Sequence, residues 1–168
     1  MEFMKNSLKG SKKEEDAQQL FFTNIKDTLF FQMHRIHITI FRLASKYLLE
    51  ENCPIRPEQI PVLVTIFRRP HISQQEVADI IQRDKSSVQR TIIALQKKNL
   101  IQIEPAVKDK RKNRLVTTEH AIEIIIQLNK VIENIEKEIA KVFGLDLAKN
   151  NIQELKGIAD KLEELNKE

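Results

Sequence analysis

Residues 73–90 decide the fold of this chain, and they read SQQEVADIIQRDKSSVQR. Ser73 is followed three residues later by Glu76, which is the spacing of a capping box. In such a box the hydroxyl and the carboxylate each bond a free amide at the start of a helix. Apolar residues recur behind the box as far as Ile81. The stretch therefore predicts a short helix over residues 73–81.

A second helix follows after a turn of about two residues. Asp84 or Ser86 can cap its start, and it runs to about Lys98. Asn99 then ends it, because asparagine tolerates the left-handed backbone that glycine usually supplies there. Three apolar residues at helical spacing would hold this helix to the domain, namely Val88, Ile92 and Leu95. Two short helices joined in this way predict a helix-turn-helix.

The flanking sequence completes a winged domain over residues 54–118. Upstream, Pro57 suits a first helical turn. It precedes the apolar residues of a short buried helix, which are Ile60, Val62, Leu63, Ile66 and Phe67. Downstream, β-prone runs at residues 100–104 and 113–117 enclose a mostly polar and charged tip at 105–112, which predicts a β-hairpin. The overall prediction is a mainly α fold with a small β-hairpin, a winged helix-turn-helix.

Long amphipathic helices are expected on both sides of this domain, over residues 17–53 and 119–168, after a flexible segment at 1–16. The first has an apolar stripe of Leu29, Met33, His37, Ile40, Ala44 and Tyr47, widened by Phe30, Phe41, Leu43 and Leu48. A later helix, starting at Thr118, has heptad-like spacing through Ala121, Ile125, Leu128, Ile132, Ile135, Ile139 and Val142. Helices that are apolar on more than one side need a further partner surface, so both regions are predicted to form a helical dimerisation region.

The composition excludes several classes of function. The three glycines of the 168 residues stand far apart, so no glycine-rich phosphate loop or nucleophile elbow can be written. A single cysteine, Cys53, excludes an internal disulfide and a paired-cysteine zinc or redox site. We find no Ser/His/Asp arrangement and no metal-ligand spacing. We therefore expect no catalytic residue, no metal, no cofactor and no enzymatic activity.

The sequence also lacks signs of secretion or membrane insertion. No apolar run reaches the roughly 18 residues that a membrane span needs. Residues 1–16 are polar and contain no hydrophobic segment of a secretory signal. We therefore expect a cytoplasmic protein that does not bind membranes.

Basic residues are concentrated in the middle of the chain, although its net charge is only +4. Residues 83–114 hold ten Lys or Arg and three acids, whereas residues 119–168 hold eleven acids and seven Lys or Arg. This distribution is typical of a domain that meets nucleic-acid phosphate with one face. On composition alone, a solvated charged surface is an equal alternative.

The helix over residues 84–98 is expected to enter the major groove of double-stranded DNA, because a helix about 10–12 Å across fits a groove about 12 Å wide. Serine hydroxyls and amides at its start can bind phosphate, glutamine can bond an adenine edge, and arginine a guanine edge or a phosphate. The wing, residues 105–112, would follow the backbone or the minor groove, with Asp109 orienting Arg111. The candidate DNA-binding residues are Ser73, Gln74, Lys85, Ser86, Ser87, Gln89, Arg90, Lys108, Lys110, Arg111 and Lys112.

These stretches resemble the MarR family of bacterial transcription regulators. The resemblance covers residues 60–118 in detail and about residues 20–168 in outline. It rests on SQQEVADII from Ser73, DKSSVQR from Asp84, LQKKNLI from Leu95, VTT from Val116, and the wing pair Asp109 and Arg111. Two positions depart from the family pattern, since Asn99 and His120 stand where glycine is usual.

The resemblance implies a homodimer whose outer helices, about residues 27–51, 118–143 and 147–165, interlock. Two-fold symmetry would place two reader helices about 34–36 Å apart on an imperfect palindrome. Members of the family commonly repress transcription, and many release DNA when a small aromatic or phenolic ligand binds between the dimer helices and the winged domain. A small-molecule effector of unknown identity is therefore implied.

Other interpretations compete with these. The winged scaffold could be a helical protein–protein interaction module without DNA binding. His34 and His37 could suit a metal, but no third ligand stands at a useful spacing, so a structural role is favoured. Cys53 could sense oxidation, but no basic residue adjoins it in sequence, so this role is not favoured. Tyr47 could line either the core or a ligand pocket.

Overall fold

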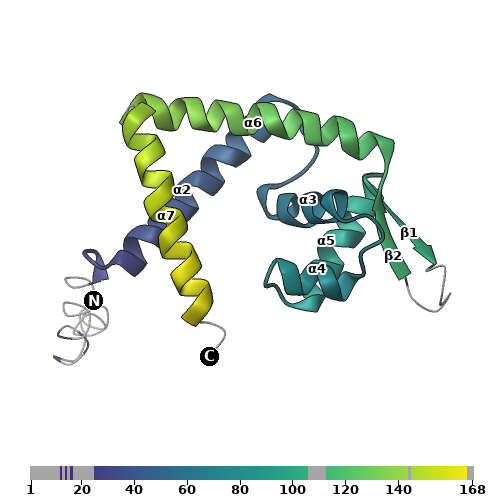
Figure 1. The fold of residues 1–168 in the computed structure, drawn as a ribbon, viewed down its shortest axis with the longest axis horizontal. Helices are drawn as coiled ribbons and strands as arrows, with labels where there is room; N and C mark the ends of the chain where they lie inside the picture. Colours follow the sequence, from purple (N-terminus) through teal and green to yellow (C-terminus); the bar gives the residue numbers. More distant parts are fainter. Residues whose placement is uncertain are drawn as a thin grey trace, which may run out of the picture. The chain divides into compact units, whose positions relative to one another are not determined.

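The computed structural model describes residues 12, 14, 16, 25–105, 113–143 and 145–165 (Figure 1). Within them, helices and one two-stranded antiparallel sheet confirm a mainly α fold with a small hairpin. The chain divides into two units, Met1–Arg42 and Leu43–Glu168. In chain order the elements are α2 (Leu29–Glu50), η1 (Pro57–Gln59), α3 (Ile60–Arg68), α4 (Gln74–Ile80), α5 (Lys85–Lys97), β1 (Ile101–Pro105), β2 (Asn113–Thr117), α6 (Glu119–Phe143) and α7 (Leu145–Leu165).

The helix-turn-helix forms from α4 and α5, as predicted. The capping box is present, because the Ser73 amide donates to Glu76 Oε2 at 2.8 Å and the Glu76 amide donates to Ser73 Oγ at 3.2 Å. The cap of α5 is Asp84 rather than Ser86, since its carboxylate accepts from the Ser87 amide at 2.8 Å. Short-range sequence signals therefore determine where both helices begin.

Both helices end on a residue with a left-handed backbone. Gln82 follows α4 with a φ of 51°, and Asn99 follows α5 with a φ of 56°. Beyond Asn99, the Leu100 amide donates back to the Leu95 carbonyl at 3.0 Å, which is the closing bond of a Schellman motif. The helix end predicted at Asn99 is therefore confirmed without a glycine.

β1 and β2 form the predicted hairpin, with Ile103 opposite Leu115. β1 starts at Ile101, one residue later than predicted, because Leu100 still belongs to the closure of α5. Leu115 also pairs with Ile72 in an isolated bridge. This second neighbour was not predicted, since a single residue of strand leaves no periodic pattern.

One cluster of buried side chains holds the unit Leu43–Glu168 together. In α5 the three residues predicted to face inward are buried. In α3, however, Phe67 was predicted to be buried and is 40% exposed, because Val62, Leu63 and Ile66 already occupy the inner face. The cluster also includes Ala44, Leu48, Val77, Ala78, Leu100, Ile101, Leu115, Ala121, Ile124, Leu128, Val131 and Ile135.

The first long helix starts close to residue 27, where the family resemblance places it. One helix or several were predicted over residues 17–53, and residues 26–28 form a turn and a bend before α2. Thr28 ends this turn, because its hydroxyl accepts from the Phe31 amide at 3.2 Å and so caps α2. The predicted residues 17–24 lie outside the described part of the chain.

The apolar stripe of α2 is buried only in part within the chain. Ala44 is buried as expected, and Tyr47 packs partly against the core. Leu48, which was assigned to the second apolar set, is only 2% exposed. Leu29 and Ile40, predicted members of the stripe, are exposed. Sequence periodicity therefore located the apolar residues of this helix, of which Ala44 and Leu48 are buried within the chain.

The predicted apolar stripe of α6 is likewise buried only in part. Its start is capped as predicted, since the Ala121 amide donates to Thr118 Oγ1 at 3.2 Å. Ala121, Leu128 and Ile135 of the predicted stripe are buried, whereas Ile132 and Val142 are exposed. Ile124 and Val131, which lie outside the stripe, are also buried. Isoleucines occur around much of the circumference of this helix, so more than one set of apolar residues has a 4-3 spacing. Exposed isoleucines remain outside the buried face at Ile122, Ile126 and Ile132.

The left-handed backbone at Asn99 gives a testable prediction for stability. Replacing Asn99 with glycine should leave the free energy of unfolding nearly unchanged, whereas Asn99→Val should lower it by about 1–2 kcal/mol, because a β-branched residue is strained at positive φ. Chemical denaturation at one protein concentration measures both. Asn113→Val, at an exposed strand position, is the matched control. Equal stability of the Asn99→Gly and Asn99→Val proteins would contradict the assignment.

Candidate nucleic-acid interface

α5 presents a polar and basic face opposite its buried one. Four predicted contact residues, Lys85, Ser86, Gln89 and Arg90, have exposed side chains. The residues that hold α5 in the core lie on the other side of the helix, so they fix its rotation. The structure therefore brings these four candidates to the outer surface of the second helix.

Ser87 lies differently from its neighbours. It is half-buried, and its amide is bonded to the Asp84 carboxylate at 2.8 Å. The amide is therefore satisfied by the cap, and the sequence-based expectation that it receives a phosphate is weakened. The Ser87 carbonyl accepts from Thr91 Oγ1 at 3.1 Å, a bond within the helix.

Ser73 and Gln74 have structural partners at the start of α4. The Ser73 hydroxyl belongs to the capping box. Gln74 Nε2 donates to the Lys85 carbonyl at 3.1 Å, and this bond joins the start of α4 to the start of α5. Both side chains therefore position the two helices, and direct DNA contact by either one stays a prediction.

Three basic residues of the segment 83–114 are bonded within the described part of the domain. Arg83 Nη1 donates to the Glu58 carbonyl at 2.9 Å. Lys98 Nζ donates to Gln59 Oε1 at 2.8 Å, and burial lowers the pKa of Lys98. Arg114 Nη1 contacts Glu76 Oε2 at 2.9 Å. Three of the ten basic residues counted in this segment therefore have partners within the domain.

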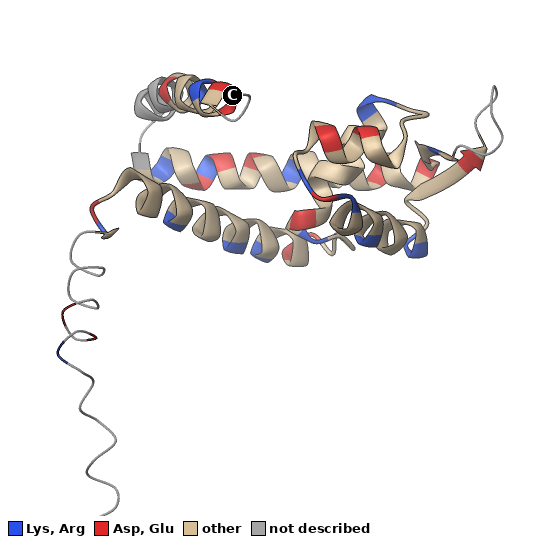
Figure 2. Ribbon diagram, turned by 90° about the horizontal axis from the view of Figure 1, so that it is seen from below, with Lys and Arg blue, Asp and Glu red and all other residues tan. Residues whose placement is uncertain are grey.

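α5 remains basic at its surface when these three residues are set aside. Its sequence contains no acidic residue, and Lys85, Arg90 and Lys97 are exposed. By contrast, acidic and basic residues are interspersed along α6 (Figure 2). The surface of α5 therefore carries basic side chains without acidic ones, whereas the surface of α6 carries both.

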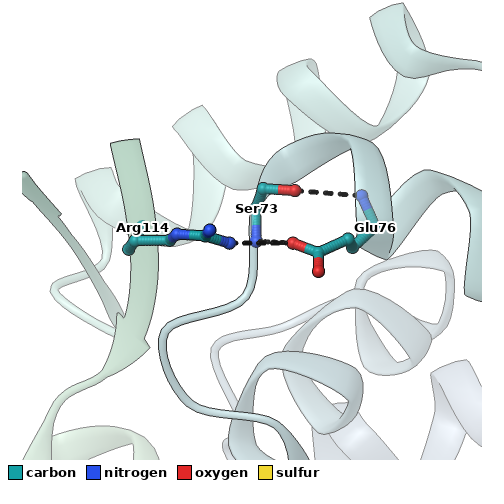
Figure 3. Close-up of polar contacts among 3 residues, drawn as sticks. All are labelled: Ser73, Glu76 and Arg114. Carbon is teal, nitrogen blue, oxygen red and sulfur yellow. Dashed lines mark hydrogen bonds and ion pairs between the residues drawn. The ribbon is translucent and has the colours of Figure 1, made fainter. Parts of the chain in front are cut away.

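Glu76 joins the helix-turn-helix to the wing (Figure 3). The same carboxylate oxygen, Oε2, accepts from the Ser73 amide at 2.8 Å and from Arg114 Nη1 at 2.9 Å. Hydrogen bonds from Ser73, followed by the charge of Arg114, lower the pKa of Glu76. The sequence indicated the capping role of Glu76, but nothing in it indicated a partner 38 residues away in β2.

Backbone hydrogen bonds reinforce this junction. The His71 amide donates to the Leu115 carbonyl at 2.9 Å, and the Leu115 amide donates to the Ile72 carbonyl at 2.8 Å. His71 Nδ1 also lies 3.5 Å from Glu104 Oε2 on β1. The base of the wing is therefore attached to the segment that leads into α4.

The predicted contacts of the wing tip fall outside the described residues. The described strands end with Pro105 paired to Asn113. The assigned roles of Lys108, Lys110, Arg111 and Lys112 in DNA binding, and of Asp109 in orienting Arg111, therefore stay predictions.

The structure also describes the surroundings of Cys53 and His37, for which redox and metal-binding roles were considered. Cys53 is buried and burial raises the pKa of its thiol, while an Ile55 backbone hydrogen bond and the charge of Lys98 act in the opposite direction. A basic residue does therefore lie near Cys53 in space, although none adjoins it in sequence. The His37 ring lies 4.5 Å from the Phe41 ring. The described residues include no cluster of three metal-binding side chains.

Among the described helices, none combines the length and the apolar character that crossing a bilayer requires.

Comparison with known proteins identifies the same region. Residues 55–112 match the model of the MarR family, and these residues include α3, α4, α5 and the hairpin strand β1. The match confirms the resemblance inferred from the motifs of the helix-turn-helix.

Solved structures agree with the fold over most of the chain. A crystal structure of MarR is 24% identical with a TM-score of 0.72, and the match covers 83% of this chain and 93% of that one. The transcriptional repressor CouR, bound to a 23-mer DNA duplex, is 18% identical with a TM-score of 0.71, covering 90% and 99%. PcaV from Streptomyces coelicolor, in complex with its natural ligand, is 17% identical with a TM-score of 0.68, covering 82% and 95%. The winged helix-turn-helix predicted from sequence is therefore confirmed.

The two bonds of Glu76 can be separated by substitution. Glu76→Gln keeps an oxygen that can cap the Ser73 amide but removes the charge that attracts Arg114. Because the pKa of Glu76 is lowered in the folded protein, its contribution is complete above the unfolded value of about 4.5 and is lost as the pH falls through the lower folded value. Wild type should therefore unfold at higher denaturant than the variant at pH 6, and the difference should shrink towards pH 3.

Arg114→Gln, which removes the other charge, should reproduce this pattern. Glu136→Gln, which neutralises an exposed carboxylate on α6, is the control for the general effect of charge. A stability difference that stays constant between pH 6 and pH 3 would contradict the role of the ion pair.

Proposed function

We propose, from the MarR-family domain that residues 55–112 form, that this protein is a transcription regulator that binds double-stranded DNA. The observation that carries the proposal is the outer face of α5, which is basic, free of acidic residues and held at a fixed rotation by a buried apolar face. A helix of about 10–12 Å fits the major groove of B-DNA, about 12 Å wide. The similarity to CouR, which was solved with a DNA duplex, adds support.

Roles in binding follow from side-chain chemistry. Gln89 would bond an adenine edge in a bidentate manner, and Arg90 a guanine edge. Lys85 and Ser86, at the start of the helix, would contact phosphate. The basic residues of the wing tip would add backbone or minor-groove contacts through Arg111 and its neighbours.

The second part of the proposal is a homodimer. α6 is buried along one face against its own chain and exposes Ile122, Ile126 and Ile132 outside that face. Exposed isoleucines on a long helix favour a further protein surface. A second copy related by a two-fold axis would duplicate α5, and this symmetry predicts an imperfectly palindromic DNA site.

Repression and ligand response complete the proposal. CouR is described as a repressor, and PcaV was solved with its natural ligand. These similarities, together with the family resemblance, support repression that a small molecule relieves. The proposed effector is a small molecule of unknown identity. The proposal includes neither a catalytic step nor a cofactor.

The alternative function is a helical protein–protein interaction module, and the exposed isoleucines of α6 are compatible with it. The two functions differ in whether the protein binds DNA. A regulator retains specific duplexes from a random library, whereas an interaction module retains none.

The first prediction for this function is a steep salt dependence. Each phosphate contact should add about −0.9 to the slope of log affinity against log salt, because bound cations displace condensed counterions from DNA. Fluorescence anisotropy with a duplex that the protein selects from a random library measures this slope. A flat response, or no retained duplex, would favour the interaction module.

A second prediction separates base from phosphate contacts. Arg90→Ala should cost about 1–3 kcal/mol of binding free energy and relax specificity at one position, whereas Arg111→Ala should weaken binding to all sequences more evenly. Lys137→Ala, on the exposed side of α6, is the control and should leave affinity nearly unchanged. Negligible effects from both arginine variants would contradict the groove assignment.

A third prediction tests the dimer without DNA. Ile126→Glu places a charge on an exposed apolar position of α6 and should shift sedimentation from dimer towards monomer, because a charge buried between subunits is unfavourable. Ile103→Glu makes the same change at an exposed position of β1 and should leave the dimer intact. Monomeric wild-type protein at micromolar concentration would exclude the dimer.

A further inference from the structure

α5 exposes one large apolar side chain among its polar and basic ones. All residues of this helix are described, and within it Ile93 is the large apolar residue that is exposed, at 44% of its surface. The other apolar residues of comparable size in α5, Val88, Ile92 and Leu95, are buried. Ile93 therefore does not contribute to the core as they do.

Ile93 lies in the middle of the proposed DNA-binding face. Positions 86, 90, 93 and 97 are separated by four, three and four residues, which places them on one side of a helix. Ser86, Arg90 and Lys97 all have exposed side chains. Ile93 thus follows Arg90 by one turn and precedes Lys97 by one turn, between two cations.

A protein partner is a poor explanation for this position. Apolar docking patches are contiguous, whereas Ile93 is flanked on its own helix face by Arg90 and Lys97. The cations point to a polyanion, so the surface next to Ile93 would be the floor of a DNA groove.

The major groove offers one apolar group to such a side chain. Every base presents a hydrogen-bond donor or acceptor there, O4 in the case of thymine, and thymine alone adds a methyl group, at C5. A branched aliphatic side chain excludes water from that methyl without leaving a polar group unpaired.

We infer that Ile93 is a specificity-determining residue, which packs on the C5-methyl group of a thymine in the major groove. This inference rests on the proposed DNA-binding function. Gln89 and Arg90 would recognise bases through hydrogen bonds, and Ile93 would recognise a base through an apolar contact alone.

The test compares thymine with deoxyuracil, which pairs identically and lacks only the methyl group. Wild-type protein first selects a duplex from a random library, and that duplex is then made with all thymines or all uracils. Affinity for the uracil duplex should fall about fourfold for one contacted methyl, and about fifteenfold for one in each half-site. Ile93→Ala should bind both duplexes with similar affinity, at the level of wild type on uracil.

Two further variants sharpen the result. Ile93→Val keeps a branched apolar side chain and should retain most of the thymine preference. Ile80→Ala removes an isoleucine of matching exposure, 42%, from the end of α4 and should retain all of it. Because Ile93 is exposed, circular dichroism should show Ile93→Ala folded as wild type.

The outcomes separate the inference from the proposed function. Equal binding of wild type to the two duplexes overturns the inference, as does an undiminished thymine preference in Ile93→Ala, and both leave DNA binding in place. Failure of wild type to retain any duplex overturns the proposed function and the inference with it.

Discussion

The fixed rotation of α5 is the constraint on which the rest of the structure depends. A 13-residue helix has room for one buried face, and Val88, Ile92 and Leu95 occupy it. Burial of three such side chains contributes several kcal/mol, of the order of 1.5–3 kcal/mol each, so rotation of the helix about its axis is strongly opposed. The direction in which each polar residue of the outer side leaves the helix is thereby set.

Polar contacts hold the wing to α4 and α5, in contrast to the apolar contacts that hold α5 in the core. One carboxylate oxygen of Glu76 serves the cap of α4 and the guanidinium of Arg114, and two backbone bonds between residues 71–72 and Leu115 flank it. The side chain of Leu115 is itself buried. An exposed ion pair of this kind contributes little energy by itself. Its effect is to select one orientation among those that the buried contacts would allow.

Local signals predicted the winged domain well. The caps at Ser73 and Asp84 and the left-handed Asn99 follow from interactions within a few residues, which a sequence displays directly. The hairpin follows from two β-prone runs on either side of a polar segment. The long helices were harder. In α6 isoleucines occur around much of the circumference, and which of them are buried depends on distant residues such as Leu48. The same limit applies to the site, because α5 positions were predicted whereas the partners of Arg83, Lys98 and Arg114 were not.

The junction after the wing has a mechanical consequence. β2 ends at Thr117 and α6 begins at Glu119, so Thr118 alone connects them. Its hydroxyl donates to the Asn99 carbonyl at 2.7 Å and accepts from the Ala121 amide at 3.2 Å. Because a single residue joins strand and helix, a change in the direction of α6 would move β2 with it, and no linker between the two elements would absorb the motion.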